Sequence, residues 1–318
     1  MMQDMPQHNT NTHGILTNAP EMRRLFVLME RAAVTEAPVL IRGETGTGKE
    51  LVAQTLHRLS TRASGPFRAV NCATLTPELL ASALFGHVKG AFTGAVRSRK
   101  GLLALTNGGT LFLDEIAELP LNLQARLLRV LETQSFVPVG GTEPVRVNVR
   151  LISATHKALR RAVDAGQFRR DLMYRIRVVP LFLPRLIDRT GDISVLTNHF
   201  ITQLNTTGTR TVTEIAPDCM EMLMSWSWPG NVRELKNVLQ SAYILGEGPT
   251  LTHDELTPEI RGEPPPGDAL SVNPLAMEEK QQLLAALREA NGSRSKASAL
   301  LGIHRTTLWR KLKSHRLL

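Results

Sequence analysis

The sequence contains few of the residues on which secreted and membrane proteins depend. Cysteine occurs only twice among 318 residues, at Cys72 and Cys219, and never in a Cys-x-x-Cys spacing. This scarcity suits a reducing compartment and argues against a cysteine-ligated metal site. No apolar run approaches the roughly 20 residues that a membrane-spanning helix needs. Residues 1–14 are polar and do not resemble a secretory signal. We therefore expect a cytoplasmic protein with no membrane contact.

Positive charge is in excess and is concentrated near the C-terminus. The chain has 38 Lys and Arg against 29 Asp and Glu, a formal net charge of +9. Between Ser293 and Leu318 there is no Asp or Glu, and the basic residues there are Arg294, Lys296, Arg305, Arg310, Lys311, Lys313 and Arg316. A solvated basic tail is one interpretation. An apolar helical pattern also runs through the segment, which favours a folded unit that contacts phosphate.

Short apolar runs alternate with helical patterns through the first 190 residues. Strands are predicted at Val39–Ile41, Phe67–Asn71, Thr110–Leu113 and Val145–Ala154. Helices are predicted at Pro20–Val34, from the end of a glycine-rich loop through Leu59, and at Pro77–Phe85, Pro120–Thr133, His156–Ala165 and Phe168–Arg175. This alternation predicts an α/β domain built on a parallel sheet with helices on both faces.

The pattern changes after residue 190. Helices predicted at Ile193–Leu204, Pro217–Trp226 and Asn231–Leu245 would form a small helical lid, and the prolines and glycines of 258–274 indicate a linker. We therefore divide the chain into a flexible arm (1–18), an α/β core (19–190), a helical lid (191–257), a linker (258–274) and a small all-α domain (275–318).

A glycine-rich loop follows the first predicted strand and opens a helix. Its residues are Gly43, Glu44, Thr45, Gly46, Thr47, Gly48, Lys49 and Glu50. Glycines let backbone N–H groups turn toward a phosphate, the helix N-terminus adds positive potential, and Lys49 would reach the outer phosphates. The strict pattern has Ser or Thr after the lysine, and Glu50 removes that contact to Mg²⁺. The loop predicts nucleotide binding, with the metal contact left to other residues.

A second buried strand ends in two acids. Asp114 and Glu115 follow Thr110–Leu113, about 65 residues beyond the glycine-rich loop. Asp114 would hold Mg²⁺, and Glu115 would polarise an attacking water, as phosphoryl transfer requires. An acidic pair of this kind can also simply start a helix. Together with the loop, however, the pair predicts a site for ATP and Mg²⁺.

Two further motifs carry arginines suited to phosphate. Arg169 and Arg175 lie six residues apart on a predicted helix. In a ring ATPase such arginines reach the nucleotide of the neighbouring subunit, although surface salt bridges are the commoner use. Arg233 lies near a helix start in Trp228–Leu235, where a lid arginine can pair with phosphate and report the nucleotide state.

The stretch Phe85–Ala95 ends in a hexapeptide of unusual composition. Its residues are Gly90, Ala91, Phe92, Thr93, Gly94 and Ala95. Glycines permit a sharp turn and alanines add no bulk, so the tip would present one apolar ring and one hydroxyl. Spacing alone is equally compatible with a phenylalanine that folds into the core. The position between the two nucleotide motifs favours an exposed contact loop that hydrolysis can drive.

These motifs resemble those of the AAA+ domain of sigma-54-dependent transcriptional activators, the bacterial enhancer-binding proteins. The matching blocks are 43–50, 85–95, 108–115, 168–175 and 228–235, within a resemblance that covers roughly 14–247. The hexapeptide is close to diagnostic, and Glu after the lysine of the loop is usual in the family. The resemblance implies an AAA+ P-loop ATPase core with a small helical lid, in a regulator of the two-component response-regulator type.

The resemblance also implies residue roles. Lys49 is similar to the phosphate lysine, Asp114 to the metal-binding acid and Glu115 to the water-activating acid. Asn71 is similar to a switch asparagine that holds the catalytic glutamate away until the ring engages its target. Arg169 and Arg175 would be arginine fingers that act in trans, Arg233 the lid sensor, and Gly90–Ala95 the contact to sigma-54. The stretch 134–143 resembles a second surface loop that supports the first.

The sequence departs from the family pattern at two places. The sensor strand commonly ends Ala-Thr-Asn, but here His156 follows Thr155, so polar sensing of the nucleotide is assigned to Thr155. Acids that the family favours before the hexapeptide are replaced by Ala83 and Val88, and Lys89 adds positive charge. The base of the loop therefore carries less negative charge than is usual in the family.

The C-terminal segment has the pattern of a helix, a glycine turn and a second helix. It resembles the Fis-type helix-turn-helix of the same family, a small all-α domain. The second helix would enter the major groove of double-stranded DNA. The predicted DNA-binding residues are His304, Arg305, Thr306, Thr307, Arg310, Lys311 and Lys313. A three-helix protein-contact module is the alternative, and the absence of acids after Ser293 argues against it.

The hypothesis from sequence is a transcription activator that binds enhancer-like DNA. A homo-oligomeric ring, dimer to hexamer, would use ATP hydrolysis to convert the closed complex of sigma-54 RNA polymerase holoenzyme into the open complex. A passive DNA-binding regulator with a vestigial ATPase is one rival, and an AAA+ remodeller of another target is a second. The intact hexapeptide and both acids disfavour the first, and the Fis-like segment disfavours the second. No sensor domain fits in 1–18, so a separate regulatory protein or control by abundance is one expectation, and a chain trimmed of its sensor domain is the alternative.

Overall fold

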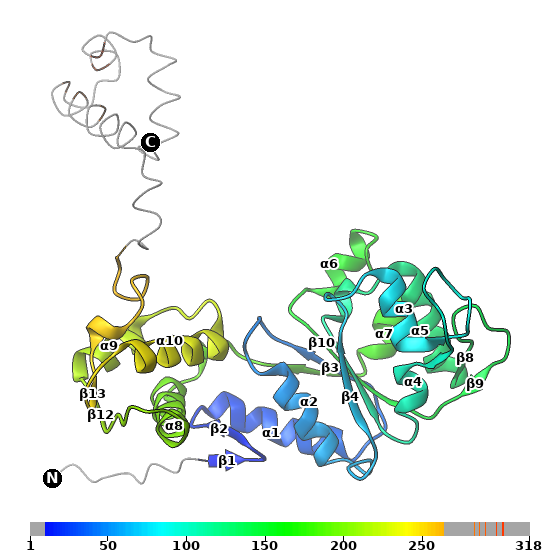
Figure 1. The fold of residues 1–318 in the computed structure, drawn as a ribbon, viewed down its shortest axis with the longest axis horizontal. Coiled ribbons are helices and arrows are strands. Elements are labelled where there is room, and N and C mark those ends of the chain that lie inside the picture. The colour runs from blue at the N-terminus through cyan, green and yellow to red at the C-terminus, as the bar shows by residue number, and fades with distance from the viewer. Residues whose placement is uncertain are drawn as a thin grey trace. The chain divides into compact units, whose positions relative to one another are not determined.

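The computed structural model describes residues 10–263 together with Leu283, Ala286, Ala290, Ala297 and Leu301. By its internal contacts the chain divides into two compact units, Met1–Leu256 and Thr257–Leu318. Figure 1 shows the first unit as a sheet covered by helices, with a separate group of helices α8 to α10. In the described residues no helix is long and apolar enough to cross a membrane.

A parallel five-stranded sheet forms the centre of the first unit. Its strand order is β11-β3-β10-β7-β4. The bounds are β3 Val39–Arg42, β4 Phe67–Asn71, β7 Thr110–Asp114, β10 Arg150–Thr155 and β11 Val179–Phe182. The prediction of a parallel sheet is confirmed, although the sequence analysis missed the edge strand β11.

Alternate residues of the central strands enter two apolar cores, one on each face of the sheet. One face is covered by α1 (Pro20–Ala33) and α2 (Lys49–Arg58). The other is covered by α3 (Pro77–Phe85), α4 (Leu102–Leu105), α5 (Leu121–Thr133), α6 (Leu159–Asp164) and α7 (Arg170–Ile176). On β7, Leu111 and Leu113 face the second group of helices, whereas Phe112 faces the first.

The strand register brings polar residues to one edge of the sheet. Asn71 at the end of β4 is opposite Asp114 at the end of β7, and Thr155 at the end of β10 is opposite Arg42 of β3. The glycine-rich loop leaves β3 at the same edge and leads into α2. Ligand sites of open α/β sheets form at this carboxyl edge because the side chains of several strands meet there.

The N-terminal residues are more ordered than the predicted arm. β1 (Thr10–Thr12) and β2 (Ile15–Thr17) form an antiparallel hairpin. The hydroxyl of buried Thr17 donates to both oxygens of Asp192, each at 2.8 Å, and the backbone N–H of Asn18 donates to the same carboxylate at 2.7 Å. The prediction of a flexible arm is therefore wrong for residues 10–18, because 10–17 form the hairpin and Thr17 and Asn18 are bonded to the start of the lid.

The lid contains the three predicted helices, α8 (Asp192–Thr207), α9 (Pro217–Ser225) and α10 (Asn231–Leu245). Strands β12 (Glu214–Ile215) and β13 (Thr250–Leu251) add a short parallel pair. Buried leucines that face inward from the helices, such as Leu196, Leu223 and Leu239, make the lid core. The bulky indole of Trp228 is 1% exposed at the turn before α10.

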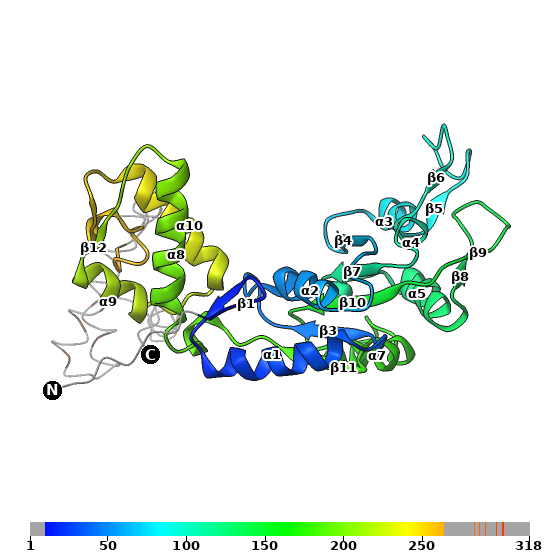
Figure 2. The same ribbon diagram turned by 90° about the horizontal axis from the view of Figure 1, so that it is seen from below.

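Two hairpin loops project from the same end of the core (Figure 2). β5 (Gly86–His87) pairs with β6 (Arg99–Lys100), and β8 (Ser135–Phe136) pairs with β9 (Val145–Arg146), both antiparallel. A single strand predicted over Val145–Ala154 is therefore wrong. The chain uses Val145–Arg146 for the second hairpin and only Arg150–Thr155 for the central sheet.

The second unit is described only in part. Residues 257–263 form turns, and four side chains make a small buried cluster, Leu283, Ala286, Ala290 and Ala297, against which Leu301 packs. The predicted linker beyond residue 263 and all the predicted DNA-binding residues lie outside the described residues.

Candidate active site

The glycine-rich loop curls around the amino group of Lys49, which is 7% exposed. Lys49 Nζ donates to the backbone oxygens of Gly43 at 3.1 Å and of Glu44 at 3.2 Å. Gly46 and Gly48 have φ angles of +80° and +100°, which favour glycine. The sequence therefore forms the predicted loop, with a cation held at its centre and α2 beginning at Lys49.

The two acids have different surroundings. Asp114 accepts hydrogen bonds from Asn71 Nδ2 at 3.1 Å and from the backbone N–H of Glu115 at 3.0 Å. Burial raises the pKa of Asp114 above its ordinary value, the adjacent Glu115 carboxylate raises it further, and Lys49 opposes the rise. A divalent cation would relieve this crowding of negative charge. One carboxylate plus phosphate oxygens is also a common way to hold Mg²⁺, so the residues present fit that metal.

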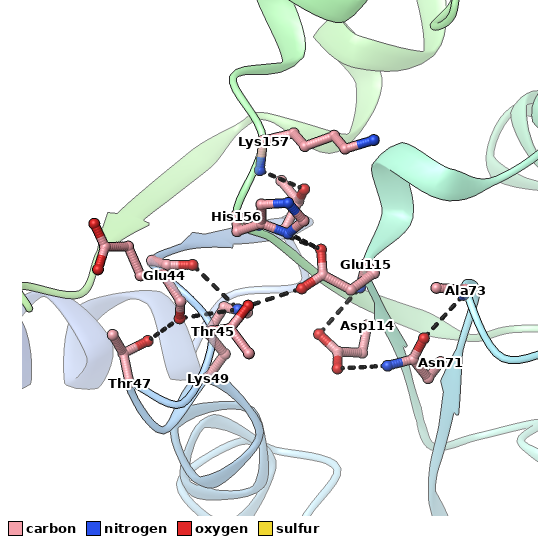
Figure 3. Close-up of polar contacts among 12 residues, drawn as sticks. Glu44, Thr45, Thr47, Lys49, Asn71, Ala73, Asp114, Glu115, His156 and Lys157 are labelled. Carbon is pink, nitrogen blue, oxygen red and sulfur yellow. Dashed lines mark hydrogen bonds and ion pairs between the residues drawn. The ribbon is translucent and has the colours of Figure 1, made fainter. Parts of the chain in front are cut away.

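Glu115 lies between the ammonium group of Lys49 and the nitrogens of His156. One carboxylate oxygen is 3.5 Å from Lys49 Nζ, and the other is 2.8 Å from His156 Nδ1 and 3.3 Å from the His156 backbone nitrogen. Figure 3 shows this chain of contacts, with Asn71 on the far side of Asp114. Asn71 thus contacts Asp114, whereas the resemblance implied that it acts on Glu115.

A polar cavity of about 820 Å³ joins these groups to the lid. Its lining residues are Thr45, Gly46, Gly48, Lys49, Glu50, Asn71, Ala73, Asp114, Glu115, Glu118, His156, Val232, Arg233, Lys236, Asn237 and Gln240. The volume suits a nucleotide-sized ligand. Lys49, Arg233 and Lys236 supply cations for phosphates, while Asp114 and Glu115 supply carboxylates.

Thr155 does not line this cavity. Its side chain is fully buried, and its hydroxyl accepts a hydrogen bond from the Lys157 backbone N–H at 3.0 Å. His156 lines the cavity instead. The assignment of polar sensing to Thr155 therefore has no support in the geometry, because strand β10 directs that side chain away from the nucleotide face and the next residue toward it.

Neither of the predicted arginine fingers lines the cavity of its own chain. Arg169 is exposed and forms a two-point ion pair with Asp171, at 3.1 and 2.7 Å. Arg175 is also exposed and donates to the backbone oxygen of Leu131 at 2.8 Å. The structure thus does not bring these two arginines to the acids of the same subunit.

The lid is attached directly to the phosphate loop. Asn231 Nδ2 donates to Glu44 Oε2 at 3.2 Å and to the Thr45 backbone oxygen at 3.1 Å. Arg189, which lies just before lid helix α8 and is 5% exposed, donates to the backbone oxygen of Thr47 at 2.7 Å. These contacts mean that the position of the lid and the shape of the loop are coupled.

The hexapeptide lies in the β5–β6 hairpin and forms a tight turn. Gly90 N–H donates to the Ala95 oxygen and Ala95 N–H to the Phe92 oxygen, both at 2.9 Å. Thr93 is exposed, whereas Phe92 is half-buried and lies edge-on to His87 with ring centroids 5.0 Å apart. The tip therefore presents the hydroxyl fully and the aromatic ring in part.

The second hairpin supports this loop. Val88 N–H donates to the Val139 oxygen at 3.1 Å, and Val139 N–H donates to the Gly86 oxygen at 2.9 Å. Val88 also packs against the glycine turn of the second loop, where a Cβ added at Gly140 would lie 3.3 Å from its methyl group. Val88 thus makes a backbone hydrogen bond and an apolar contact at a position where the family favours an acid.

Comparison with known proteins agrees with this architecture. Residues 15–182 match the family described as the Sigma-54 interaction domain, 187–272 match the AAA+ ATPase lid domain, and 274–315 match the bacterial regulatory protein, Fis family. The chain belongs to the sigma-54-dependent activators. It is accordingly an AAA+ ATPase with a helix-turn-helix DNA-binding domain, and the matched families imply sigma-54 and DNA as partners.

The activator is similar to longer curated proteins over almost all of its length. Regulatory protein AtoC of Escherichia coli (strain K12) is 44% identical over 310 residues, which are 95% of this chain and 67% of AtoC. The Nif-specific regulatory protein of Klebsiella pneumoniae is 42% identical over 305 residues, which are 94% of this chain and 58% of that protein. The activator thus spans about two thirds of the length of AtoC and a smaller share of the Nif-specific regulatory protein.

Solved structures show the same fold. The crystal structure of NtrX from Brucella abortus in complex with ADP has 36% sequence identity and a TM-score of 0.72, and the match covers 94% of this chain and 69% of NtrX. A RuvB mutant from Thermotoga maritima, at 15% identity and a TM-score of 0.51, covers 93% of this chain and 89% of its own, and shows the fold alone.

The sequence motifs did not identify every site residue, and Lys236, Asn231 and Arg189 are examples. Lys236 lines the cavity one helical turn after Arg233, a spacing from which it could have been inferred. Asn231 was quoted only as part of the block around Arg233. Arg189 gave no local signal, because its contact with Thr47 joins residues 142 apart in the sequence.

Proposed function

We propose that this activator binds ATP with Mg²⁺ in the cavity beneath the lid and uses hydrolysis to press the Gly90–Ala95 loop against sigma-54. The observation that carries the proposal is the arrangement of charge. Lys49, Arg233 and Lys236 line the cavity together with Asp114 and Glu115. Phosphoryl transfer needs cations for the phosphates and carboxylates for the metal and the water in one place.

Each group has one task in this scheme. Backbone N–H groups of the loop and Lys49 Nζ would bind the outer phosphates, for which Lys49 must leave the oxygens of Gly43 and Glu44. Asp114 would hold Mg²⁺, which neutralises charge on the phosphates when bound. Glu115 would accept the proton of the attacking water, once its carboxylate is free of its present partners.

A ring of subunits would complete the site. Arg169 and Arg175 are exposed and lie outside their own cavity, as residues that serve a neighbouring subunit must. Arg169 would give up its ion pair with Asp171 to contact a phosphate. The charge-assisted contact to the nucleotide can offset the loss of that ion pair. We infer a homo-oligomer, with a hexamer as the closed form.

A short path connects the site to the contact loop. The Asn71 side chain donates to the Asp114 carboxylate, and the backbone N–H of the next residue, Cys72, donates to the Asp114 backbone oxygen at 2.9 Å. The chain then enters α3, and α3 ends at Phe85 immediately before the β5–β6 hairpin. A change at Asp114 would therefore reach the loop through one helix.

The DNA-binding domain would place the ring near its promoter. The predicted contacts remain predictions, because His304 to Lys313 lie outside the described residues. The Fis-family match supports binding to an enhancer-like duplex. A separate regulatory protein as the source of the signal also remains a hypothesis.

The test is open-complex formation by purified activator, ATP, Mg²⁺ and polymerase with or without sigma-54 on a supercoiled promoter. The intact chain should open the promoter only with sigma-54 and hydrolysable ATP. Glu115→Ala should bind ATP but fail to hydrolyse it. Normal turnover by Glu115→Ala would refute the role of this residue. DNA binding with no ATP-dependent opening would instead favour the passive regulator, and ATP-dependent activity without sigma-54 would favour a remodeller of another target.

A further inference from the structure

The carboxylate of Glu115 is engaged at both of its oxygens. Among residues 10–263, the groups that bond it are Lys49 Nζ at 3.5 Å on one oxygen, and the ring and backbone nitrogens of His156 on the other. The Glu115 side chain is only 13% exposed. One oxygen thus accepts two hydrogen bonds from His156, and only the other, beside Lys49, is left to accept a proton from water.

Asn71 is not available to hold Glu115 in this arrangement. Its Nδ2 donates to Asp114 Oδ2 at 3.1 Å, and its Oδ1 accepts from the backbone N–H of Ala73 at 2.9 Å. Both ends of the amide are therefore used on the Asp114 side of the site (Figure 3). The hydrogen bonds to Glu115 come instead from His156, just after strand β10.

We propose that His156 is the positioning residue that restrains Glu115 and keeps basal ATP hydrolysis low. This inference rests on the proposed role of Glu115 as the base. The His156–Glu115 distance of 2.8 Å is that of a charge-assisted hydrogen bond. A carboxylate can only accept, so the proton on Nδ1 is donated to Glu115. The backbone N–H of His156 points at the same oxygen and directs the carboxylate toward the ring.

The two partners of Glu115 differ in how nucleotide affects them. Phosphates compete directly for Lys49, because an ammonium group in a phosphate loop binds the outer phosphates. The imidazole of His156 is attached to a different strand and does not depend on Lys49. After phosphate binding, His156 remains as the restraint, and release requires a new partner for its ring or for Glu115. An arginine of a neighbouring subunit is such a partner.

The position of His156 makes it suitable for substitution. Its side chain is 42% exposed, so its removal leaves no buried cavity. Asparagine can place an amide N–H close to where Nδ1–H lies, and alanine can place nothing there. Lys157 is a matched neighbour, because its side chain is also 42% exposed and pairs outside the Glu115 contact with Glu118 at 2.6 Å.

The experiment measures basal ATP hydrolysis, without polymerase, for the full chain and for His156→Ala, His156→Asn and Lys157→Ala. His156→Ala should raise kcat roughly fivefold. The hydrogen bond stabilises the resting position of Glu115, so its loss lowers the free-energy barrier to hydrolysis by part of the strength of that bond. KM for ATP should change less than about twofold because the residue does not contribute to uniform binding of the substrate. The basal kcat of His156→Asn and of Lys157→Ala should match that of the unsubstituted chain.

A second readout separates restraint from a general structural effect. ATP turnover per protomer of the unsubstituted chain should rise with protein concentration as subunits assemble. The turnover of His156→Ala should rise by a smaller factor, because the restraint on Glu115 is already absent. If kcat of His156→Ala is unchanged or lower while ATP binding and Tm stay normal, the role of His156 is overturned but the proposed function is not. Failure of the unsubstituted chain to bind or hydrolyse ATP overturns the proposed function, and this inference with it.

Discussion

Asn231, the first residue of lid helix α10, donates a hydrogen bond to the carboxylate of Glu44 in the phosphate loop at 3.2 Å. The same side chain accepts from the Leu186 backbone N–H at 2.8 Å, and it is fully buried with a φ of +53°. A buried polar residue in this backbone conformation is retained only where several partners hold it. Through Asn231 the lid and the phosphate loop therefore act as one site.

The first prediction concerns Asn231→Ala. It leaves the buried Leu186 N–H without a partner, which should cost about 1–3 kcal/mol and lower Tm by several degrees. ATP affinity should fall because Glu44 and Thr45 lose their contact to the lid. Asn198→Ala, at an exposed position of lid helix α8 outside the cavity lining, is the control, and its stability should change by less than about 0.5 kcal/mol. Calorimetry and nucleotide titration measure both, and equal effects of the two variants would contradict the role of Asn231.

Gly46 tests the close approach of the loop to the lid. A Cβ at Gly46 would collide with the backbone oxygen of Gly230, so Gly46→Ala must displace the lid. We expect ATP affinity to fall at least about tenfold. Gly248→Ala is the control, because Gly248 has a φ of +72° but nothing within 4 Å of the added atom. It should cost about 1 kcal/mol of stability from backbone strain and leave ATP affinity unchanged.

Phe92→Ala should separate hydrolysis from promoter opening. Phe92 lies against His87 in the hairpin and does not line the nucleotide cavity, so ATP turnover should stay within about twofold. Open-complex formation should be lost because the tip no longer presents its aromatic ring. Val96→Ala provides the control, since Val96 is 79% exposed just outside the hexapeptide. Activation by Phe92→Ala at the normal level would refute the assignment of the loop.

The pKa of Asp114 predicts a dependence of stability on pH. Its folded-state pKa is raised, so ionisation costs stability as pH rises from the ordinary value of about 4 through the raised value. The Tm of Asp114→Asn relative to the unsubstituted chain should therefore increase over this window, measured without nucleotide and with a chelator. A difference independent of pH would contradict it.

Asp171→Asn supplies the opposite case for comparison. The hydrogen bond from Arg169 lowers the pKa of Asp171, so its stabilising contribution is complete above its ordinary pKa and is lost only at lower pH. The Tm difference of Asp171→Asn should thus be flat above about pH 5. Circular dichroism melts of the three chains between mildly acidic and neutral pH give this comparison.

Much of this protein was determined by local sequence patterns. The predicted strands Val39–Ile41 and Thr110–Leu113 occur in the sheet almost as expected, because buried parallel strands need continuous apolar runs. The predicted strand Phe67–Asn71 also occurs, at the edge of the sheet, where its residues are half-buried or exposed. The phosphate loop, the acids at 114 and 115 and the hexapeptide were recognisable because their chemistry requires particular residues at short spacing. The family followed from these motifs.

The tertiary structure decided which polar groups meet. His156 and Glu115 are 41 residues apart in the sequence, and Asn231 and Glu44 are 187 apart. Their contacts depend on strand order and on how the lid packs, which no local pattern contains. The division of Val145–Thr155 between two sheets and the bonding of residues 17–18 to Asp192 have the same origin. Local sequence thus determined the elements and their chemistry, and long-range packing determined the partners of each side chain.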